Sequence, residues 1–410
     1  MSLQKEQVVF MDKISVLICD DSALMRNLIG RIIADYDGLE VVAKAENGQD
    51  LLDKIPVYKP DVILLDIEMP VMTGVQFLEK RKQLHIDIPV IILSSIATEG
   101  AAVTMRCLEL GAADFITKPG GSSVTLKIGD VSDEIIEYVS SYGASYAALH
   151  GKHVPDPDYF SHLVKLKAAA RFVAKKKGED AAKLATITKT EFVPPASWSA
   201  PRTKEPVVIT PEREGGRIEI IAIGISTGGP NALREMLAKI DPDLKQPVLV
   251  VQHMPAGFTA EFAESLDHIC PLTVTEAKDG EPVLGGHVYI APGNYHLTVE
   301  KRSLNAVIRL NQEDLRNGHR PSADMLFESV AHQYQNRALG VIMTGMGRDG
   351  AAQLAEMRKK GAWTLGQDQA SCIVYGMPKV AWEMGGVQKQ VSLANLADEI
   401  SRLAREHINS

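Results

Sequence analysis

Short apolar runs alternate with longer amphipathic stretches along the first third of the chain. The runs Ile14–Cys19, Val62–Leu65 and Val90–Leu93 are almost continuously apolar, which is typical of parallel strands that are buried on both faces. The stretches Ala23–Ala34 and Thr98–Leu110 between them are predicted to be helices. This order of strands and helices predicts a doubly wound α/β domain.

The same alternation resumes at Arg217 and continues nearly to the end of the chain. We predict strands at Ile218–Ile225, Pro247–Gln252 and Ala338–Thr344, a hairpin at Leu297–Leu310, and helices at Asn231–Ile240, Ala351–Lys360 and near Leu393–His407. The second half is therefore predicted to be another α/β domain. The fold class is two doubly wound parallel-sheet domains, the first flavodoxin-like and the second Rossmann-like.

The segment between these two patterns has a different character. Residues 131–150 are compatible with a helix that closes the first domain, and residues 161–177 form a predicted helix with six Lys or Arg and no acid. Such a basic run is usually a solvated face, with a docking surface as the alternative. A Pro-rich, charged stretch follows and indicates a linker. We predict a first domain over 13–135, a helical and Pro-rich linker over 136–216, and a second domain over 217–408.

Composition narrows the class of protein. The 410 residues are 45% hydrophobic and 23% charged, as in ordinary globular domains, and the net charge of −8 argues against nucleic-acid binding. No apolar run reaches the roughly 18 residues that a membrane span needs. The first twelve residues lack a signal pattern, and the four cysteines have no metal-binding spacing. We therefore expect a cytoplasmic protein without membrane insertion.

Acidic residues end two of the predicted strands in the first domain. Asp20 and Asp21 follow the first strand and Asp66 ends the second, and the carboxyl ends of parallel strands share one crevice. Clustered carboxylates with few other ligands suit Mg²⁺. Ser94 and Lys118 add a hydroxyl and a positive charge on the same rim. Helix capping is the alternative role for any single Asp, but it does not account for the whole group.

This arrangement resembles the receiver domain of two-component response regulators over residues 14 to about 130. The match includes Asp66–Pro70, Gly74 and Gly111–Pro119. The resemblance implies that Asp66 accepts a phosphoryl group from a histidine kinase, with Mg²⁺ held by Asp20, Asp21, Asp66 and Glu68. It also implies that Ser94, Phe115 and Lys118 form the switch that reports phosphorylation.

A glycine-rich segment, Ile223–Pro230, joins the first predicted strand of the second domain to its helix. Such a turn can bind an anion at the helix N-terminus. It can instead hold Ser226 on a tight bend, with backbone N–H groups forming an oxyanion hole. It can also be a structural turn only. The motif alone leaves these alternatives open.

Two further residues favour the serine interpretation. His253 follows the strand Pro247–Gln252, and Asp349 follows the strand Ala338–Thr344. With Ser226, they lie at the carboxyl ends of strands that we expect to be parallel. Serine becomes a strong nucleophile when an imidazole takes its proton and a carboxylate orients that imidazole. The sequence therefore predicts a Ser226–His253–Asp349 triad.

The second domain resembles the catalytic domain of the chemotaxis protein-glutamate methylesterases over about 217–408. The shared text is Gly224–Pro230, Val251–Pro255, Ile290–Gly293, Arg320–Asp324 and Thr344–Gly350. The resemblance implies a phosphorylation-controlled enzyme that hydrolyses glutamyl methyl esters of methyl-accepting chemoreceptors and, in some members, deamidates receptor glutamines. It further implies that Thr227 and the backbone near Met346 support the oxyanion, and that the ester chemistry uses no cofactor.

Three other functions are alternatives for the second domain. A non-catalytic binding module would make the triad a coincidence. A nucleotide-binding domain would use the Gly224–Pro230 loop, but it would lack a Walker lysine, a GxGxxG motif and a ribose-binding acid. A lipase-like esterase for small molecules is the closest alternative. The rate on methylated receptor fragments, compared with small chromogenic esters, distinguishes it from a receptor methylesterase.

Overall fold

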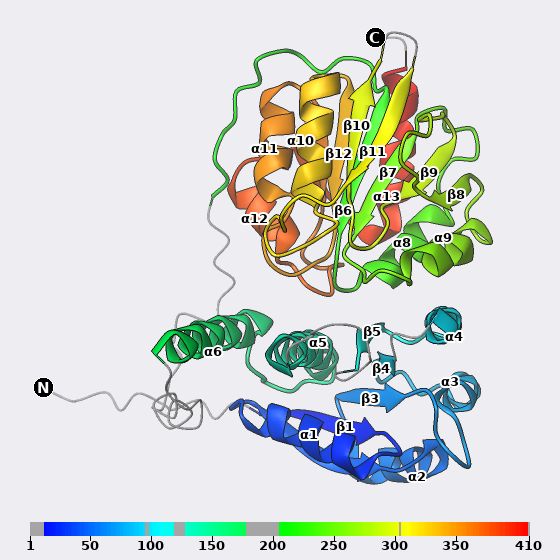
Figure 1. Cartoon of the computed structure of the whole chain (residues 1–410), viewed down its shortest axis with the longest axis vertical. Coiled ribbons are helices and arrows are strands. Elements are labelled where there is room, and N and C mark those ends of the chain that lie inside the picture. Colours follow the sequence, from blue (N-terminus) through cyan, green and yellow to red (C-terminus); the bar gives the residue numbers. More distant parts are fainter. Residues whose placement is uncertain (1–11, 95–97, 119–127, 178–204, 303–304, 409–410) are drawn as a thin grey trace, which may run out of the picture. The chain divides into compact units, whose positions relative to one another are not determined.

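A computed structural model describes residues 12–94, 98–118, 128–177, 205–302 and 305–408. The chain divides into two compact units, which are described in turn and drawn in Figure 1. No helix in the described part of the chain is long and apolar enough to span a bilayer.

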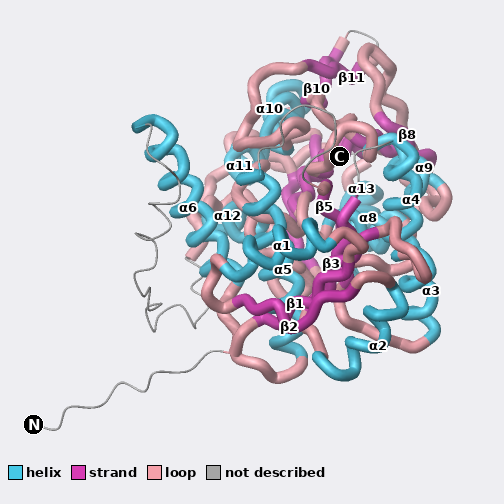
Figure 2. The backbone as a smooth tube through the Cα atoms, turned by 60° about the horizontal axis from the view of Figure 1, so that its bottom comes forward, coloured by secondary structure: helices cyan, strands magenta, loops and turns pink. Residues whose placement is uncertain are grey.

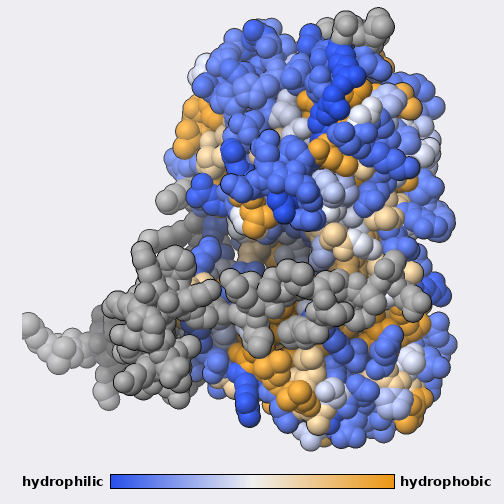
Figure 3. Space-filling model, viewed as in Figure 1, coloured by the Kyte–Doolittle hydropathy of each residue, from blue (hydrophilic) through white to orange (hydrophobic). Residues whose placement is uncertain are grey.

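The face of the C-terminal unit that Figure 3 shows is mostly hydrophilic. Among the cysteines, Cys19 and Cys107 are buried and Cys270 and Cys372 are partly exposed, all as free thiols.

The N-terminal unit contains a five-stranded parallel sheet. Its strands are β1 (Ile14–Cys19), β2 (Leu39–Ala45), β3 (Val62–Asp66), β4 (Val90–Ser94) and β5 (Asp114–Thr117). They lie in the order β2-β1-β3-β4-β5, and Figure 2 shows β2, β1 and β3 side by side. Every residue of β1, β3 and β4 is buried, because helices cover both faces. This strand order confirms the predicted flavodoxin-like fold.

Helices cover this sheet in two groups. α1 (Ala23–Ala34) and α5 (Ile128–Leu149) pack together, and α2 (Gly48–Tyr58) packs with α3 (Gly74–Gln83), while α4 (Thr98–Glu109) joins β4 to β5. α5 approaches β1 closely at Gly143, where a Cβ would lie 2.3 Å from Ile14 Cγ2. The predicted boundary after residue 135 falls inside α5, a continuous helix that contacts β1, β3 and β5.

The basic segment at residues 161–177 lies within a helix, as predicted. α6 (Pro157–Lys177) packs on α5, and its Phe160 is completely buried beside Gly38. Lys167 Nζ lies 3.8 Å from the centre of the Tyr36 ring, within the range of a cation–π interaction. α6 is therefore part of the N-terminal unit.

The C-terminal unit contains a seven-stranded parallel sheet in the order β14-β13-β12-β6-β7-β9-β8. The strands are β6 (Ile220–Ile225), β7 (Val248–Gln252), β8 (Thr273–Glu276), β9 (His287–Ile290), β12 (Ala338–Ile342), β13 (Trp363–Gln367) and β14 (Lys389–Val391). From β6 the chain proceeds to one side of the sheet, and it later returns through β12 to the other side. The order thus reverses between β6 and β12, which is where doubly wound sheets place their ligand crevice.

Two groups of helices cover this sheet. α10 (Ala323–Tyr334), α11 (Ala351–Lys359) and α12 (Met377–Glu383) pack together, as do α8 (Gly229–Leu237), α9 (Thr259–Asp267) and α13 (Leu393–Glu406); Figure 1 shows α10 and α11 apart from α8, α9 and α13. The antiparallel hairpin of β10 (His296–Lys301) and β11 (Ala306–Asn311), which was predicted, packs on α10. The predicted doubly wound fold of this half is confirmed.

Residues 205–216, which the sequence assigned to the linker, form a strap along the C-terminal unit. The N–H groups of Val207, Glu212 and Gly216 donate to the carbonyls of Glu383 (3.1 Å), Lys359 (2.7 Å) and Asn336 (3.0 Å). Trp363 Nε1 donates to the Gly216 carbonyl over 3.1 Å. The strap is hydrogen bonded to the last residues of α11 and α12 and to the loop after α10, so its Pro-rich composition does not mark a free linker.

We predict that a fragment starting at residue 205 is more stable than one starting at residue 217. Deleting the strap removes its backbone hydrogen bonds to Glu383, Lys359 and Asn336, each of which contributes about 1 kcal/mol. The free energy of unfolding should fall by roughly 2–4 kcal/mol. Urea unfolding of the two fragments measures the difference, and equal stabilities would show that the strap contributes nothing.

Candidate active site and phosphoacceptor site

Ser226, His253 and Asp349 meet at the carboxyl edge of the large sheet. Ser226 directly follows β6, His253 directly follows β7, and Asp349 lies in the loop after β12. Ser226 Oγ is 3.0 Å from His253 Nδ1, and His253 Nε2 is 2.8 Å from Asp349 Oδ2. The three residues therefore form a continuous hydrogen-bonded relay at the point where the strand order reverses, as predicted from their positions in the sequence.

The turn that carries Ser226 is held by hydrogen bonds from both sides. Its N–H donates to the Thr344 carbonyl (3.0 Å), and its carbonyl accepts from Gly229 N (2.7 Å) and from Gln252 Nε2 (3.1 Å). A Cβ at Gly229 would lie 1.9 Å from Gln252 Oε1, so a larger residue would displace the side chain that donates to the Ser226 carbonyl. Gly228 is the N-cap residue of α8 and has φ +79°, a conformation that favours glycine. The serine is thus fixed on a tight strand-to-helix bend.

The hydrogen bonds of His253 indicate which ring nitrogen carries its proton. Asp349 only accepts, so His253 Nε2 carries the proton and Nδ1 is the acceptor for the Ser226 hydroxyl. The histidine side chain is 8% exposed, and its backbone N–H donates to the Ile225 carbonyl over 3.2 Å. The arrangement leaves Nδ1 ready to take the serine proton.

Asp349 is buried at the N-terminus of α10 and accepts several hydrogen bonds. Its donors are Ser322 Oγ (2.7 Å), Ala323 N (2.6 Å), Asn317 Nδ2 (2.8 Å) and His253. Burial raises the pKa of this carboxyl, but the interactions with His253, Ser322 and Asn317 outweigh burial and lower the pKa well below its ordinary value. Asp349 is therefore an anion held in one orientation.

The residues predicted to support an oxyanion lie on two adjoining loops. Thr227 is buried directly after Ser226, and its carbonyl accepts from Thr344 Oγ1 over 3.0 Å. Met346 lies two residues after Thr344, and at Gly345 between them a Cβ would approach Ser226 Cβ to 2.8 Å. The oxyanion role of Thr227 and Met346 stays a prediction.

Two residues at this site were not predicted from the sequence. The ring of His319 stacks on that of His253 with centroids 3.8 Å apart. Asn317 donates to Asp349 and also to Asp324 Oδ2, over 2.6 Å. The signal that would have found them is the Asn317–Gly318 pair, which is typical of a tight turn.

The acids of the N-terminal unit converge as predicted. One carboxylate oxygen from each of Asp20, Asp21 and Asp66 lies within 4.8 Å of the others, with Asp20 and Asp66 buried and Asp21 exposed. This donor set fits a hard divalent cation such as Mg²⁺. Glu68 was also predicted to bind the metal, but it does not belong to this three-carboxylate group and its side chain is exposed.

Lys118 neutralises part of this negative charge. Its ammonium lies 2.9 Å from Asp20 Oδ2 and 2.7 Å from Asp66 Oδ1. Burial raises the pKa of Asp66 above its ordinary value, since it outweighs the opposing effect of Lys118. Hydrogen bonds to Asp66 and Asp20 overcome the effect of burial on Lys118 and raise its pKa. Asp66 is therefore a buried carboxylate whose charge is only partly compensated.

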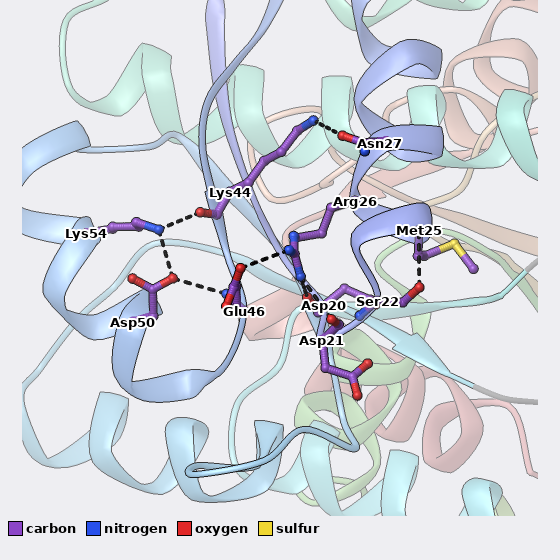
Figure 4. A network of polar contacts seen from close by, with 10 residues as sticks. All are labelled: Asp20, Asp21, Ser22, Met25, Arg26, Asn27, Lys44, Glu46, Asp50 and Lys54. Atoms are coloured by element: carbon purple, nitrogen blue, oxygen red, sulfur yellow. Dashed lines mark hydrogen bonds and ion pairs between the residues drawn. The ribbon is translucent and has the colours of Figure 1, made fainter.

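A second network fixes the turn between β1 and α1. Arg26 Nη1 donates to the carbonyls of Asp20 (2.7 Å) and Asp21 (3.0 Å), and Nη2 donates to Glu46 over 3.1 Å, as Figure 4 shows. Asp20 Oδ1 accepts from Ser22 N over 2.9 Å. These contacts hold two of the three acids at the sheet edge without using Asp66.

The predicted switch residues lie on or directly after the neighbouring strands β4 and β5. Ser94 ends β4 and Phe115 lies in β5, and both are buried. The Ser94 carbonyl accepts from Lys118 N over 2.7 Å. Ser94 is thus linked through the backbone to the lysine that contacts Asp66, and the switch role of these residues stays a prediction.

The folds and sites define a class of protein: a receiver-type domain joined to an α/β domain with a relay typical of serine hydrolases. Residues 16–128 match the response regulator receiver domain, and residues 221–400 match the CheB methylesterase family. The chain is 52% identical to a protein-glutamate methylesterase/protein-glutamine glutaminase of Treponema pallidum, over 97% of this chain and 98% of that protein. The chain belongs to this family.

Other relatives have the same name. The protein from Treponema denticola is 51% identical over 97% of this chain and 100% of its own length. The protein from Clostridium acetobutylicum is 37% identical over 96% and 99%. The two resemblances noted from the motifs are therefore confirmed over nearly the whole chain.

We predict that Asp66→Asn stabilises the receiver domain. The pKa of Asp66 is higher in the folded domain than in the unfolded chain. The protonated carboxyl therefore favours folding at low pH, and this contribution to the free energy of unfolding is lost as pH rises from the unfolded pKa through the folded pKa. The amide removes that loss, so the midpoint of thermal unfolding should rise by a few degrees near neutral pH in a metal-free buffer. It should also depend less on pH in the acidic range.

Asp61→Asn is the matched control for this substitution. Asp61 is another buried carboxylate with a lysine partner, but it accepts from Lys152 Nζ (2.8 Å) and Ser15 N (2.8 Å) and lies outside the acidic group. Its replacement should lower the midpoint. If Asp66→Asn also lowers it, the charge of Asp66 is fully compensated and the interpretation is wrong.

Proposed function

We propose that the chain is a phosphorylation-controlled protein-glutamate methylesterase that acts on methyl-accepting chemoreceptors. The observation that carries this proposal is the Ser226–His253–Asp349 relay at the reversal point of the large sheet. Ser226 is the nucleophile, His253 the general base and Asp349 the residue that orients His253. Relatives that match almost the full length carry this activity in their names.

The relay supports a two-step hydrolysis. In the first step, Ser226 Oγ bonds to the ester carbonyl carbon while its proton moves to His253 Nδ1. When the C–OCH₃ bond breaks, Nδ1 returns the proton to the methoxide oxygen and methanol leaves. Water then attacks the glutamyl-serine ester in the same way, which releases a glutamate carboxylate and restores Ser226. With a glutamine side chain the same steps release ammonia, in accordance with the second activity in the relatives' names.

Backbone donors near the serine would stabilise the negative oxygen that forms in both steps. We assign this role to Thr227 and to the backbone near Met346, because their loops flank Ser226. A donor that is already in place before reaction stabilises the transition state more than water does. The ester chemistry needs no cofactor in this scheme.

The receiver would control this activity through Asp66. Asp20, Asp21 and Asp66 would hold Mg²⁺, which neutralises the carboxylates and the incoming phosphoryl oxygens when bound. Asp66 would accept the phosphoryl group from a chemotaxis histidine kinase, and Lys118 would remain beside it as a fixed positive charge. Ser94 and Phe115 would report the modification.

The structure also supports different limits for the two domains. We propose that the receiver extends through α5 to Leu149 with α6 packed on it, since both helices are part of the N-terminal unit. The catalytic domain would start near residue 205, because the strap is hydrogen bonded to it. The connector between them is then shorter than the segment 136–216.

Replacing Ser226 with Ala should lower turnover by roughly four to six orders of magnitude and leave the fold intact. The reason is that the Ser226 hydroxyl is the group that His253 Nδ1 contacts, at 3.0 Å. Methanol release from methylated receptor fragments measures the effect. Ser329→Ala is the control, because the Ser329 hydroxyl accepts from Val299 N of β10 (3.1 Å) and donates to the Leu326 carbonyl (2.8 Å) rather than to a residue of the relay. Near-normal release from folded Ser226→Ala would exclude the triad, and a preference for small chromogenic esters would favour a lipase-like esterase.

Asp66→Asn should abolish labelling by a radioactive acyl phosphate and remove the increase in methanol release that this donor causes. Asp66 is the buried acid whose pKa is raised and that contacts Lys118. Basal hydrolysis should persist. Asp61→Asn again serves as the control and should be labelled normally. Normal phosphate uptake by Asp66→Asn would show that another residue is the acceptor.

A further inference from the structure

The tight turn Arg316–His319 contacts the Ser226–His253–Asp349 relay. Arg316 N donates to the His319 carbonyl (3.1 Å) and His319 N donates to the Arg316 carbonyl (3.0 Å). Between them, Asn317 has φ +54° and Gly318 has φ +86°. Two successive positive φ values define a type I′ turn, for which Asn-Gly is a preferred sequence. The side chains at residues 317 and 319 therefore project from a short, conformationally restricted loop.

Asn317 contacts the carboxylate end of the relay. Its Nδ2 donates to Asp349 Oδ1 over 2.8 Å and to Asp324 Oδ2 over 2.6 Å. Ser322 Oγ donates to the same Asp349 oxygen, whereas Oδ2 accepts from His253. Asn317 thus helps to fix the carboxylate plane in which Oδ2 points at His253.

His319 contacts the imidazole itself. The rings of His319 and His253 are stacked, with centroids 3.8 Å apart and planes inclined by 12°. Hydrogen bonds at Nδ1 and Nε2 hold two edges of the His253 ring, but they leave it able to rotate about the line between its partners. A parallel ring on one face restricts that rotation, because tilting would lose van der Waals contact between the two rings.

His319 is suited to this passive role because it stays uncharged. Burial and the neighbouring His253 lower its pKa to about 3, against the opposing effect of Asp349. A neutral ring can stack on His253 both before and after His253 takes the serine proton. A charged ring would repel the imidazolium at that step.

We propose that the turn Arg316–His319 is a positioning element of the triad, in which Asn317 orients Asp349 and His319 holds the plane of the His253 ring. The inference rests on the proposed esterase function. Neither side chain exchanges a proton in the reaction. The turn thus sets the fraction of time for which Ser226, His253 and Asp349 are aligned for reaction, although it lies outside the triad.

Three substitutions test this proposal in the full-length protein. His319→Ala removes the stacked ring, His319→Phe keeps an aromatic ring that cannot titrate, and Asn317→Gly removes the amide but suits the positive φ. His407→Ala is the control, because it removes a comparable stack on Trp363 (4.2 Å, 22°) at the opposite edge of the sheet. For each variant, kcat and KM for methanol release are measured across pH, together with thermal unfolding.

We expect His319→Ala and Asn317→Gly to lower kcat by about tenfold to a hundredfold with little change in KM, as misalignment of a reacting group does. His319→Phe should restore kcat to within about threefold of the wild type, since an aromatic contact is worth on the order of a factor of ten. The pH profile of His319→Phe should match that of the wild type. His407→Ala should be fully active.

Several results would overturn the proposal. If His319→Phe is as slow as His319→Ala or shifts the pH profile, then His319 exchanges protons or binds substrate polar groups. If kcat of both His319→Ala and Asn317→Gly equals that of the wild type while Ser226→Ala is inactive, the turn has no positioning role and the proposed function stands. If Ser226→Ala remains active on the same substrate, the proposed function fails first. Should His319→Ala not fold, His319→Phe and Asn317→Gly still decide the question.

Discussion

The geometry of the catalytic domain depends on the hydrogen bonds that the buried carboxylate of Asp349 accepts. Its two oxygens accept hydrogen bonds from the start of α10, from the Arg316–His319 turn and from His253. A charge buried in this way is stabilised by each hydrogen bond that it accepts. The same contacts therefore join the loop after β12 to α10 and align the relay toward Ser226.

The charge of Asp66 in the receiver is less completely compensated than the charge of Asp349. Asp66 is also buried at the carboxyl edge of a parallel sheet, but its neighbours are two more carboxylates and one lysine. Asp349 has a lowered pKa and a fixed orientation, whereas Asp66 has a raised pKa and incomplete compensation. A group that only orients a neighbour benefits from full compensation. A group that reacts with a phosphoryl donor benefits from unsatisfied charge that a cation and the phosphoryl group can use.

The strap at residues 205–216 shows why composition is a weak guide to boundaries. Pro and charged residues are common in linkers because they do not build a core. The strap attaches through backbone groups instead, for example Glu212 N to the Lys359 carbonyl, and through close approaches to Gly361 and Gly385, where a Cβ would lie 2.4 Å and 2.0 Å from strap carbonyls. Backbone pairing of an extended segment leaves no periodic signal in side-chain type.

The sequence by itself determined the two parallel α/β units and the residues at their strand ends. Buried parallel strands have nearly continuous apolar sequences, and residues that follow such a run lie at the carboxyl edge of the sheet. This rule predicted the positions of Ser226, His253, Asp349, Asp20 and Asp66. Tertiary structure alone decided the strand order of the large sheet, the path of the strap and the contacts of Asn317 and His319 with the relay. All these features depend on contacts between segments that are far apart in the chain. The local sequence around a residue does not specify which distant side chain it contacts.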